Sequence, residues 1–231
     1  MQGCLWSIMA GCCLMGQVYG GGLTQPAPPA ADQEVKMQAD TNGTRSAELS
    51  ETEKQTLLAI ARDTLHWCVH KRAGEFPLEK YALTPALRVP TATFVTLKSK
   101  GQLRGCIGSL EPEEELYLSV HRNTINAATR DYRFPAVQPV ELPQLTLDIS
   151  ILSPTRPLAT AEEFLPGRMG IILEKAGRRA VFLPEVALEQ GWTRAQTLTH
   201  LSRKAGLPAD AWQKGARFKA FTSTILSTTA H

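Results

Sequence analysis

The chain has 231 residues, of which 43% are hydrophobic and 20% charged, and this composition is typical of a globular protein. Its length allows one domain of about 150–200 residues with a tail. The 25 basic and 22 acidic side chains give a net charge of +3, which is too balanced for a nucleic-acid-binding protein, because such proteins carry a clustered basic surface.

Five cysteines are spread along the chain: Cys4, Cys12, Cys13, Cys68 and Cys106. Their spacing matches neither a disulfide framework nor the Cys/His pattern of a zinc site. A reducing compartment fits this usage best. We therefore predict a cytoplasmic protein without a bound metal or cofactor.

The N-terminal residues 1–18 are moderately apolar, and the first charged side chain of the chain is Asp32. A secretory signal would need a basic segment that is missing here. Met9–Cys12 resembles a lipoprotein cleavage site, which would make Cys12 a lipid anchor and the chain's link to a membrane. Because positive charge is absent, we favour a third interpretation, a disordered extension.

Residues 20–46 are rich in Gly, Pro, Ala, Asn, Asp and Thr and contain few large apolar side chains. Such a segment cannot bury enough surface to offset its chain entropy. We therefore predict that residues 1–46 form a disordered extension and linker. Residues 47–231 are predicted to form one domain.

The first ordered element is predicted to be a helix that starts at Ser50, since Ser50 and Glu53 have the spacing of a capping box. Its apolar side chains fall on one face at helical spacing: Leu57, Leu58, Ala61, Leu65, Cys68 and Val69. Gly74 follows the end of this helix. His66 and His70 have i, i+4 spacing but lie on the other side, so we interpret them as exposed side chains rather than metal ligands.

Six further segments have the alternation or composition of strands. They are Ala92–Lys98, Gln102–Gly108, Leu145–Leu152, Gly170–Lys175, Arg178–Leu183 and Ala216–Leu226. The first and second of these, and the fourth and fifth, are separated by short turns and are predicted to form hairpins.

Two more helices are predicted between the strands. One begins at Glu113–Glu115, where negative charge suits the N-terminal dipole, and runs to about Asp131. The other begins at the capping box of Thr193 and Gln196 and ends before Gly206. Hairpins force antiparallel neighbours, so the fold class is α+β, with an antiparallel or mixed sheet of about six strands and flanking helices.

The run Leu103–Gly108 places two glycines beside a cysteine within a strand, which predicts a bulge or a close approach to the backbone. Strand alternation predicts that Leu103 and Ile107 face the core while Arg104 and Cys106 face outward, about 6–7 Å apart. The guanidinium would then lower the pKa of the thiol, as a nucleophilic cysteine requires. The alternative is that Cys106 is a small buried side chain, the commonest fate of free cysteines.

Several motifs in order resemble the AMMECR-domain family (AmmeMemoRadiSam system protein A). They are Leu103–Gly108, Arg130–Pro135, Leu147–Ser153, Gly167–Leu173, Val181–Ala187, Gly191–Trp192 and Arg203–Leu207. The resemblance extends from about Ser50 to Leu226. A second cysteine common in the family is replaced by Ser202, which weakens any mechanism that needs a cysteine pair.

This resemblance implies an AMMECR-like α+β fold with a cleft near the hexapeptide Leu103–Gly108 and no settled activity. Prokaryotic members are similar to one component of a three-part set, beside a Memo-like protein and a radical SAM protein. The resemblance thus implies those two proteins as partners, and the chemistry can then lie in the partners rather than in this chain.

Our leading hypothesis is an accessory component whose cleft holds a small anionic ligand or a partner's peptide. The residues predicted to bind it are Arg104, Gly105, Ile107, Gly108, Arg130, Asp131 and Arg133. In this view Asp131 orients Arg104; the equally weighted alternative is a structural Asp–Arg network that fixes the turn before Pro135. The second hypothesis is an enzyme with Cys106 as catalytic nucleophile, assisted by Asp131 or His121.

Overall fold

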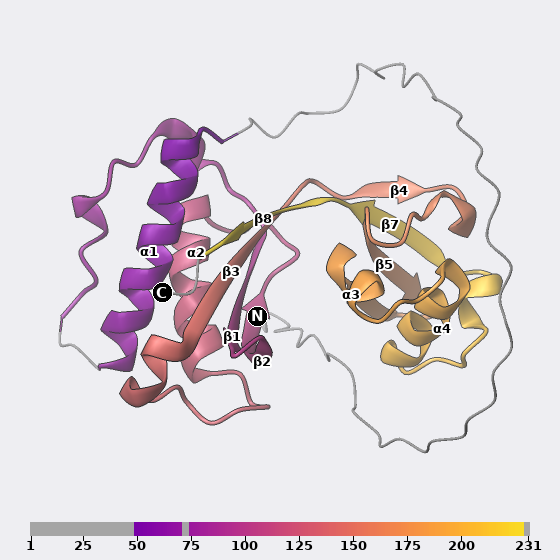
Figure 1. The fold of residues 1–231 in the computed structure, drawn as a ribbon. Helices are drawn as coiled ribbons and strands as arrows, with labels where there is room; N and C mark the ends of the chain where they lie inside the picture. Colours follow the sequence, from indigo (N-terminus) through magenta and orange to yellow (C-terminus); the bar gives the residue numbers. More distant parts are fainter. Residues whose placement is uncertain (1–48, 71–73, 229–231) are drawn as a thin grey trace, which may run out of the picture. The chain divides into compact units, whose positions relative to one another are not determined.

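Two antiparallel sheets of four strands each form the folded part of the chain, in a computed structural model that describes residues 49–70 and 74–228 (Figure 1). All of these residues belong to one structural unit. The predicted extension at residues 1–46 lies outside the described residues. The α+β fold class with antiparallel strands is confirmed.

The first sheet has the strand order β2-β1-β3-β8. Its strands are β1 (Thr93–Ser99), β2 (Gln102–Gly108), β3 (Leu145–Leu152) and β8 (Ser223–Ser227). Two long helices, α1 (Glu51–Val69) and α2 (Leu116–Thr129), pack on each other and on this sheet (Figure 1). Together they enclose a core that contains Leu57, Val95 and Ile149, none of which has exposed surface.

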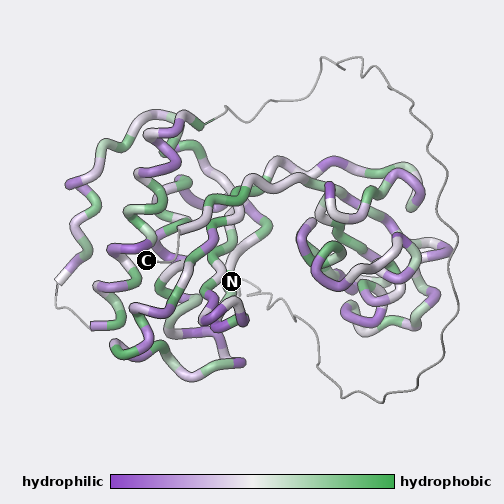
Figure 2. Tube along the Cα trace, viewed as in Figure 1, coloured by the Kyte–Doolittle hydropathy of each residue, from purple (hydrophilic) through white to green (hydrophobic). Residues whose placement is uncertain are grey.

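Helix α1 begins at the predicted capping box. The Glu53 backbone N–H donates to Ser50 Oγ at 3.3 Å, and the Ser50 N–H donates to the Glu53 carboxylate at 2.8 Å. Apolar and polar stretches alternate along this helix (Figure 2), and its predicted apolar face is buried or half-buried. His66 and His70 are exposed and stack on each other, and the described residues contain no group of three or more side chains suited to a metal ion.

The second sheet has the strand order β4-β7-β5-β6. Its strands are β4 (Arg156–Leu158), β5 (Gly170–Lys175), β6 (Arg178–Phe182) and β7 (Arg217–Phe221). Two helices belong to this part, α3 (Pro184–Glu189) and α4 (Arg194–Lys204). Helix α4 starts at the capping box predicted for Thr193 and Gln196, and its Leu198 and Leu201 are fully buried against the sheet.

Short 3-10 helices connect these elements in the part of the chain that the structure describes. They are η1 (Leu78–Lys80), η2 (Pro85–Arg88), η3 (Pro139–Gln144), η4 (Ala161–Glu163) and η5 (Ala211–Gln213). No helix among the described residues is long and apolar enough to cross a membrane.

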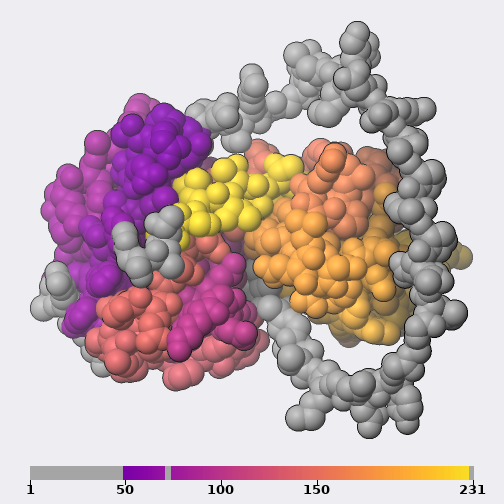
Figure 3. Space-filling model, viewed as in Figure 1, coloured from indigo at the N-terminus to yellow at the C-terminus, as the bar shows by residue number. Residues whose placement is uncertain are grey.

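The structure differs from the sequence prediction in the number of strands and sheets. The segment expected to be one strand, Ala216–Leu226, is divided into β7 and β8, which belong to different sheets (the yellow segment in Figure 3). The division falls at Thr222, whose carbonyl accepts from the Ser153 N–H while its own N–H donates to Ser153 Oγ, both at 2.9 Å. This exchange joins the two connections between the sheets. The three-residue strand β4 was not predicted either.

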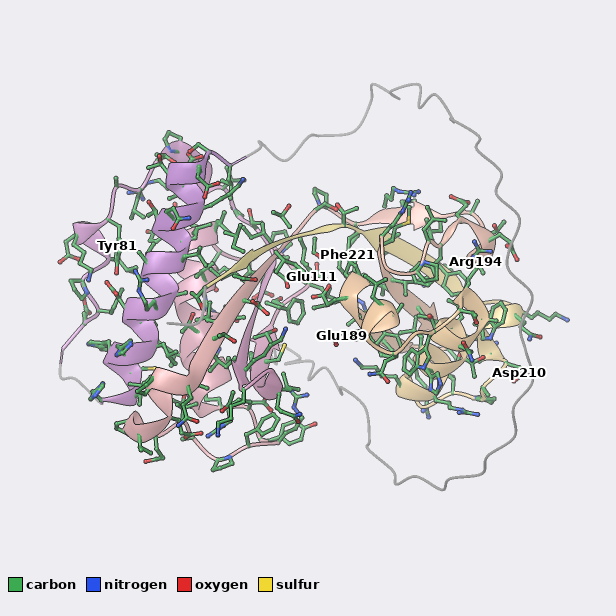
Figure 4. The ribbon with its side chains drawn as sticks, viewed as in Figure 1. Tyr81, Glu111, Glu189, Arg194, Asp210 and Phe221 are labelled. Carbon is green, nitrogen blue, oxygen red and sulfur yellow. The ribbon has the colours of Figure 1, made fainter. Side chains whose placement is uncertain are left out.

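A third apolar cluster is shared by both sheets. Phe94 and Cys106 contribute from the first sheet, and Ile172, Val181 and Phe221 contribute from the second (Phe221 is labelled in Figure 4). Strands β1 and β2 are therefore covered on both faces, by helices on one side and by this cluster on the other. Because both faces of β2 are covered, side chains of the hexapeptide are buried on either face of the strand.

Candidate functional site

Strand β2 contains a bulge within the hexapeptide. Leu97 of β1 lies opposite Gly105, and the next residue, Lys98, lies opposite Leu103, so Arg104 is the extra residue. The bulge interrupts strand alternation. Leu103 consequently packs with Cys106 against the cluster shared by both sheets, while Ile107 packs into the helix-covered core. The predicted bulge is present, but the predicted facing of Leu103 together with Ile107 is wrong.

Arg104 is held by an acidic partner that the sequence did not suggest. Its Nε donates to Glu141 Oε1 at 2.7 Å and its Nη2 donates to Glu141 Oε2 at 3.1 Å. The guanidinium also lies over the ring of Phe134, 5.9 Å from its centre. The hydrogen bonds from Arg104 lower the pKa of the Glu141 carboxyl. The expected orientation of Arg104 by Asp131 is therefore wrong.

The two glycines of the hexapeptide make room for the protein itself. A Cβ atom at Gly105 would clash with the carbonyl oxygen of Ala127 in α2. One at Gly108 would clash with the Phe94 ring and the Thr93 carbonyl oxygen. The two glycines do allow a close approach to the backbone, as predicted, but the elements that approach are α2 at Gly105 and β1 at Gly108. The backbone of Gly105 is consequently not a surface open to a ligand.

Cys106 is buried, with 5% of its surface exposed, and the prediction that it faces outward is wrong because the second sheet covers that face of β2. Thr96 Oγ1 donates to its sulfur at 3.2 Å. Burial raises the pKa of the thiol, against the opposing effects of the Thr96 hydrogen bond and the charge of Arg133. The environment therefore favours the thiol over the thiolate.

Asp131 and Arg133 form a network that closes the free edge of β2. The Cys106 N–H donates to Asp131 Oδ2 at 2.8 Å, and Arg133 Nη2 donates to the Cys106 carbonyl at 3.3 Å. Arg133 Nε and Nη2 donate to the Asp131 carboxylate at 2.9 and 2.6 Å. Burial would raise the pKa of Asp131, but the hydrogen bonds from Arg133 and from the Cys106 N–H lower it overall. These contacts are those of a structural Asp–Arg network, which was the alternative to a ligand-binding role for Asp131 and Arg133.

Lys204 has the corresponding position at the edge of the second sheet, and the sequence did not single it out as a site residue. Its Nζ donates to the Val181 carbonyl of β6 at 3.0 Å and lies over the Phe182 ring at 4.8 Å. Burial lowers the pKa of Lys204 to about 8. His121, proposed as an assistant to Cys106, instead bonds to Thr64 Oγ1 at 2.9 Å and stacks against an aromatic ring on the α1 side of α2.

A pocket of about 380 Å³ opens beside the last residue of the hexapeptide. Its lining comes from the end of β2, the loop that follows it, one face of α2 and the edge strand β6. The residues are Phe94, Gly108, Ser109, Leu110, Glu111, Glu113, Glu114, Ser119, Arg122, Asn123, Asn126, Arg130, Arg179, Ala180 and Val181 (Glu111 is labelled in Figure 4). Of the predicted ligand-binding residues, the structure brings Gly108 and Arg130 to this pocket.

The two side-chain amides that α2 contributes to the lining differ in the number of hydrogen bonds they make. Asn123 is 6% exposed, and its Nδ2 donates to the Thr93 carbonyl at 3.2 Å and to Thr93 Oγ1 at 3.0 Å, while its Oδ1 has no hydrogen-bond partner among the described residues. Asn126 is 7% exposed, and its side chain makes no hydrogen bond within the described part of the chain. The polar atoms of Asn126 are not fully buried, so they remain open to the pocket. Asn126 is therefore the least satisfied side-chain amide of the lining.

The three arginines of the pocket are not equivalent. Arg122 pairs with Glu114, and Arg179 Nη1 donates to Glu111 Oε1 at 3.1 Å. The Nε atom of Arg179 is buried without a hydrogen bond. Arg130, the C-cap residue of α2, makes no ion pair within residues 49–70 and 74–228. One guanidinium of the lining is thus available to another molecule.

Sequence reasoning missed Asn123, Asn126 and Arg179 as pocket residues. The spacing of Ser119, Asn123, Asn126 and Arg130 does place four polar side chains on one face of α2, and this was a usable signal.

These features define an α+β domain of two antiparallel sheets with a polar pocket beside a glycine-containing strand. The AMMECR1 family model matches residues 58–226, which is more than half of the chain. A protein of Methanothermobacter thermautotrophicus is 37% identical over 172 residues, covering 72% of this chain and 88% of the relative. A protein of Methanosarcina mazei is 33% identical over 183 residues, covering 77% of this chain and 92% of the relative.

Structural comparison gives the same result. The crystal structure of an uncharacterized protein from Pyrococcus horikoshii matches with a TM-score of 0.66 and 30% sequence identity, covering 73% of this chain and 88% of that chain. This chain belongs to the AMMECR1 family, which confirms the resemblance inferred from its motifs.

Proposed function

We propose that this domain is a binding component that holds a small anionic ligand, or a partner's peptide, in the pocket between α2 and β6. The observation that carries the proposal is the side-chain amide of Asn126, which has no hydrogen-bond partner among the described residues and lies at the wall of a pocket of about 380 Å³. Its polar atoms are not fully buried, so they are open to the pocket. A ligand in the pocket can therefore hydrogen-bond to both the oxygen and the nitrogen of this amide.

The charge and size of the pocket support the same function. Within the described part of the chain, Arg130 offers a guanidinium without an ion pair. Guanidinium groups bind carboxylates and phosphates through two parallel hydrogen bonds. The volume lies at the lower end of the range for small-molecule sites, roughly 300–1,000 Å³. In this proposal Gly105 acts indirectly, because the missing side chain lets α2 lie close to β2 and so positions Asn126.

We also propose that the binding component acts with a Memo-like protein and a radical SAM protein in the cytoplasm. The support for this partnership is the family resemblance. Co-expression of the three proteins and affinity purification of this chain tests it. The partnership predicts that both other proteins elute with this chain at a stable ratio, and their absence would contradict it.

The alternative function, a thiol-dependent enzyme with Cys106 as nucleophile, has weaker support. Its basis is the sequence pattern of a cysteine between glycines. The burial of the sulfur and its raised pKa both oppose nucleophilic attack on a substrate. For this reason we place the ligand at Asn126 and Arg130 rather than at the thiol.

Native mass spectrometry of the protein purified from co-expressing cells tests the binding function. We expect a bound mass on the wild type that is lost in Asn126→Leu and reduced in Arg130→Ala. The control is Arg217→Ala, an exposed arginine of β7 that does not line the pocket, and this variant should keep the bound mass. Retention of the bound mass in both pocket variants would contradict the proposal.

A further inference from the structure

The pocket lining is electrically neutral as a whole. It contains three arginines and three glutamates, and two of the arginines are paired within it, Arg122 with Glu114 and Arg179 with Glu111. Within the described residues, Arg130 is left as the lining cation without an ion pair. A single guanidinium matches a single carboxylate. A phosphate monoester carries about −1.5 to −2 charges at neutral pH and would meet too little positive charge here.

Glu113 is the lining glutamate that makes no ion pair with the described residues, and its position makes the two ends of the pocket electrostatically different. Glu113 precedes the first turn of α2, whereas Arg130 follows the last turn, so the negative and positive ends lie at opposite ends of the helix. An anionic group is repelled from the Glu113 end and attracted to the Arg130 end. The carboxylate of a ligand therefore belongs beside Arg130.

Two amides lie on the same helix face, between these ends. Asn126 is one turn before Arg130, and Asn123 is about one turn before Asn126, so the three side chains extend over roughly 10 Å along the axis. An extended peptide advances about 3.4 Å per residue, so three peptide residues cover this length. A side-chain carboxamide carries one acceptor and two donors, which complements the N–H and C=O groups of a peptide bond.

We infer that the pocket binds an acylated α-amino carboxylate, the chemical unit at the C-terminus of a peptide, with its carboxylate on Arg130 and the preceding amides on Asn126 and Asn123. This inference rests on the proposed binding function and names the ligand class for the same site. Asn123 contributes through its Oδ1, which has no partner among the described residues. Asn126 contributes both donor and acceptor.

The unit has two sources, a peptide C-terminus and a free N-acylated amino acid, and three probes distinguish them. They are N-acetyl-Ala-Ala-Ala, the same tripeptide with a C-terminal amide, and N-acetylalanine. Titration calorimetry on the full chain should show that the tripeptide acid binds about tenfold or more tightly than its amide, because the amide form has no negative charge to form an ion pair with Arg130. Tighter binding of the tripeptide than of N-acetylalanine indicates the peptide source, and equal binding indicates the free amino acid derivative.

Two variants test the carboxylate contact at Arg130 and the amide contact at Asn126 separately. Arg130→Ala should bring the acid and the amide to equal affinity, while Asn126→Leu should weaken both forms by a similar factor. Arg217→Ala is the matched arginine control and should preserve the preference for the acid. Circular dichroism would show whether Asn126→Leu unfolds the protein. In that case Asn126→Asp replaces it, and its added carboxylate should weaken binding of the acid form selectively, because the two negative charges repel each other.

The failure of this inference is distinguishable from failure of the binding function. Equal affinity of the wild type for acid and amide forms overturns the ligand class. Binding of inorganic phosphate or adenosine monophosphate without binding of any acylated amino carboxylate also overturns it, while leaving a binding function in place. Absence of any bound mass in native mass spectrometry, together with no binding of these probes, overturns both.

Discussion

Cys106 and Cys68 show how surroundings set the chemistry of a thiol. Both lie in the described part of the chain, Cys106 buried between the two sheets and Cys68 half-buried on α1. Burial raises the pKa of Cys68 to about 11 and also raises that of Cys106. Neither thiol is therefore activated, and access to the reagent becomes the factor that separates them.

The first residue-level prediction concerns alkylation by iodoacetamide. We expect Cys106 to react more slowly than Cys68, by roughly tenfold or more at neutral pH, because its modification requires local opening of the sheet. Mass spectrometry of the separate peptides measures both rates in one sample. A denatured sample, in which the two rates should converge, is the control. Faster labelling of Cys106 in the native protein would contradict its burial and revive the thiol-enzyme alternative.

Arg104 is a residue whose charge is used by an ion pair within the protein. Its charge was expected to serve a cysteine or a ligand, yet its Nε and Nη2 both donate to Glu141 in η3. The bulge at Arg104 interrupts the alternation that was expected to place this side chain on the same face as Cys106. Its contribution is to fix η3 in the connection between α2 and β3, and neither Arg104 nor Glu141 lines the pocket.

At the level of elements, both sheets have an edge strand whose backbone groups are satisfied by side chains. Asp131 and Arg133 bond to the N–H and C=O of Cys106 in β2, and Lys204 bonds to the Val181 carbonyl in β6. Buried backbone groups need such partners, and exposed edges invite pairing with other chains. The family motifs around Asp131 and Lys204 thus have a structural explanation that requires no ligand.

The prediction at this scale concerns the edge of β2. Asp131→Asn should lower the free energy of unfolding by about 3–5 kcal/mol, because it removes the buried carboxylate charge that forms an ion pair with Arg133. Urea unfolding measures this value, and Asp210→Asn, an exposed aspartate, is the control with an expected change within about 0.5 kcal/mol.

The pH dependence follows from the lowered pKa of Asp131. A carboxyl whose folded pKa lies below its unfolded value of about 3.9 stabilises the fold above that value. This stabilisation is lost as the pH falls through the folded pKa. The difference between wild type and Asp131→Asn should therefore be constant from pH 5 to 7 and shrink below about pH 4. A difference that grows on acidification would contradict the assignment.

Local patterns predicted the elements, and non-local contacts explain what was missed. Leu145–Leu152 was predicted with the observed bounds, because alternation is a property of neighbouring residues. The division of Ala216–Leu226 depends on hydrogen bonds between Thr222 and Ser153, which are 69 positions apart. No periodicity within either segment encodes that pairing.

The distinction between local patterns and non-local contacts also applies to the candidate site. The facing of Cys106 was wrong for two non-local reasons, the bulge opposite Leu97 and the second sheet that covers β2. Arg130 was predicted as a ligand-binding residue and does line the pocket, whereas Asn126 becomes notable only once the lack of a hydrogen-bond partner is known. Satisfaction of polar groups is a property of the folded chain and is absent from the sequence pattern.

At the scale of the whole described domain, the two sheets share a cluster of buried side chains in addition to the separate core of each sheet. Phe94 and Leu152 from the first sheet meet Ile172 and Phe221 from the second. The phenyl ring of Phe221 also fills the space that a side chain at Gly170 would need. The chain crosses between the sheets twice, after β3 and between β7 and β8. Shared burial and double connection predict that the sheets unfold together.

Substitution in the core of one sheet should therefore lower protection in both. Leu201→Ala removes a fully buried side chain of α4 that contacts the second-sheet core alone, at a cost of about 2–5 kcal/mol. Hydrogen exchange should then accelerate by a similar factor at the slowest amides of β1 and β5, such as Val95 and Ile172, because both exchange through the same global opening. Leu188→Ala, at a leucine that is 68% exposed, is the matched control and should leave both rates unchanged. Acceleration confined to β5 would show that the sheets are separate folding units and that the shared cluster does not couple them.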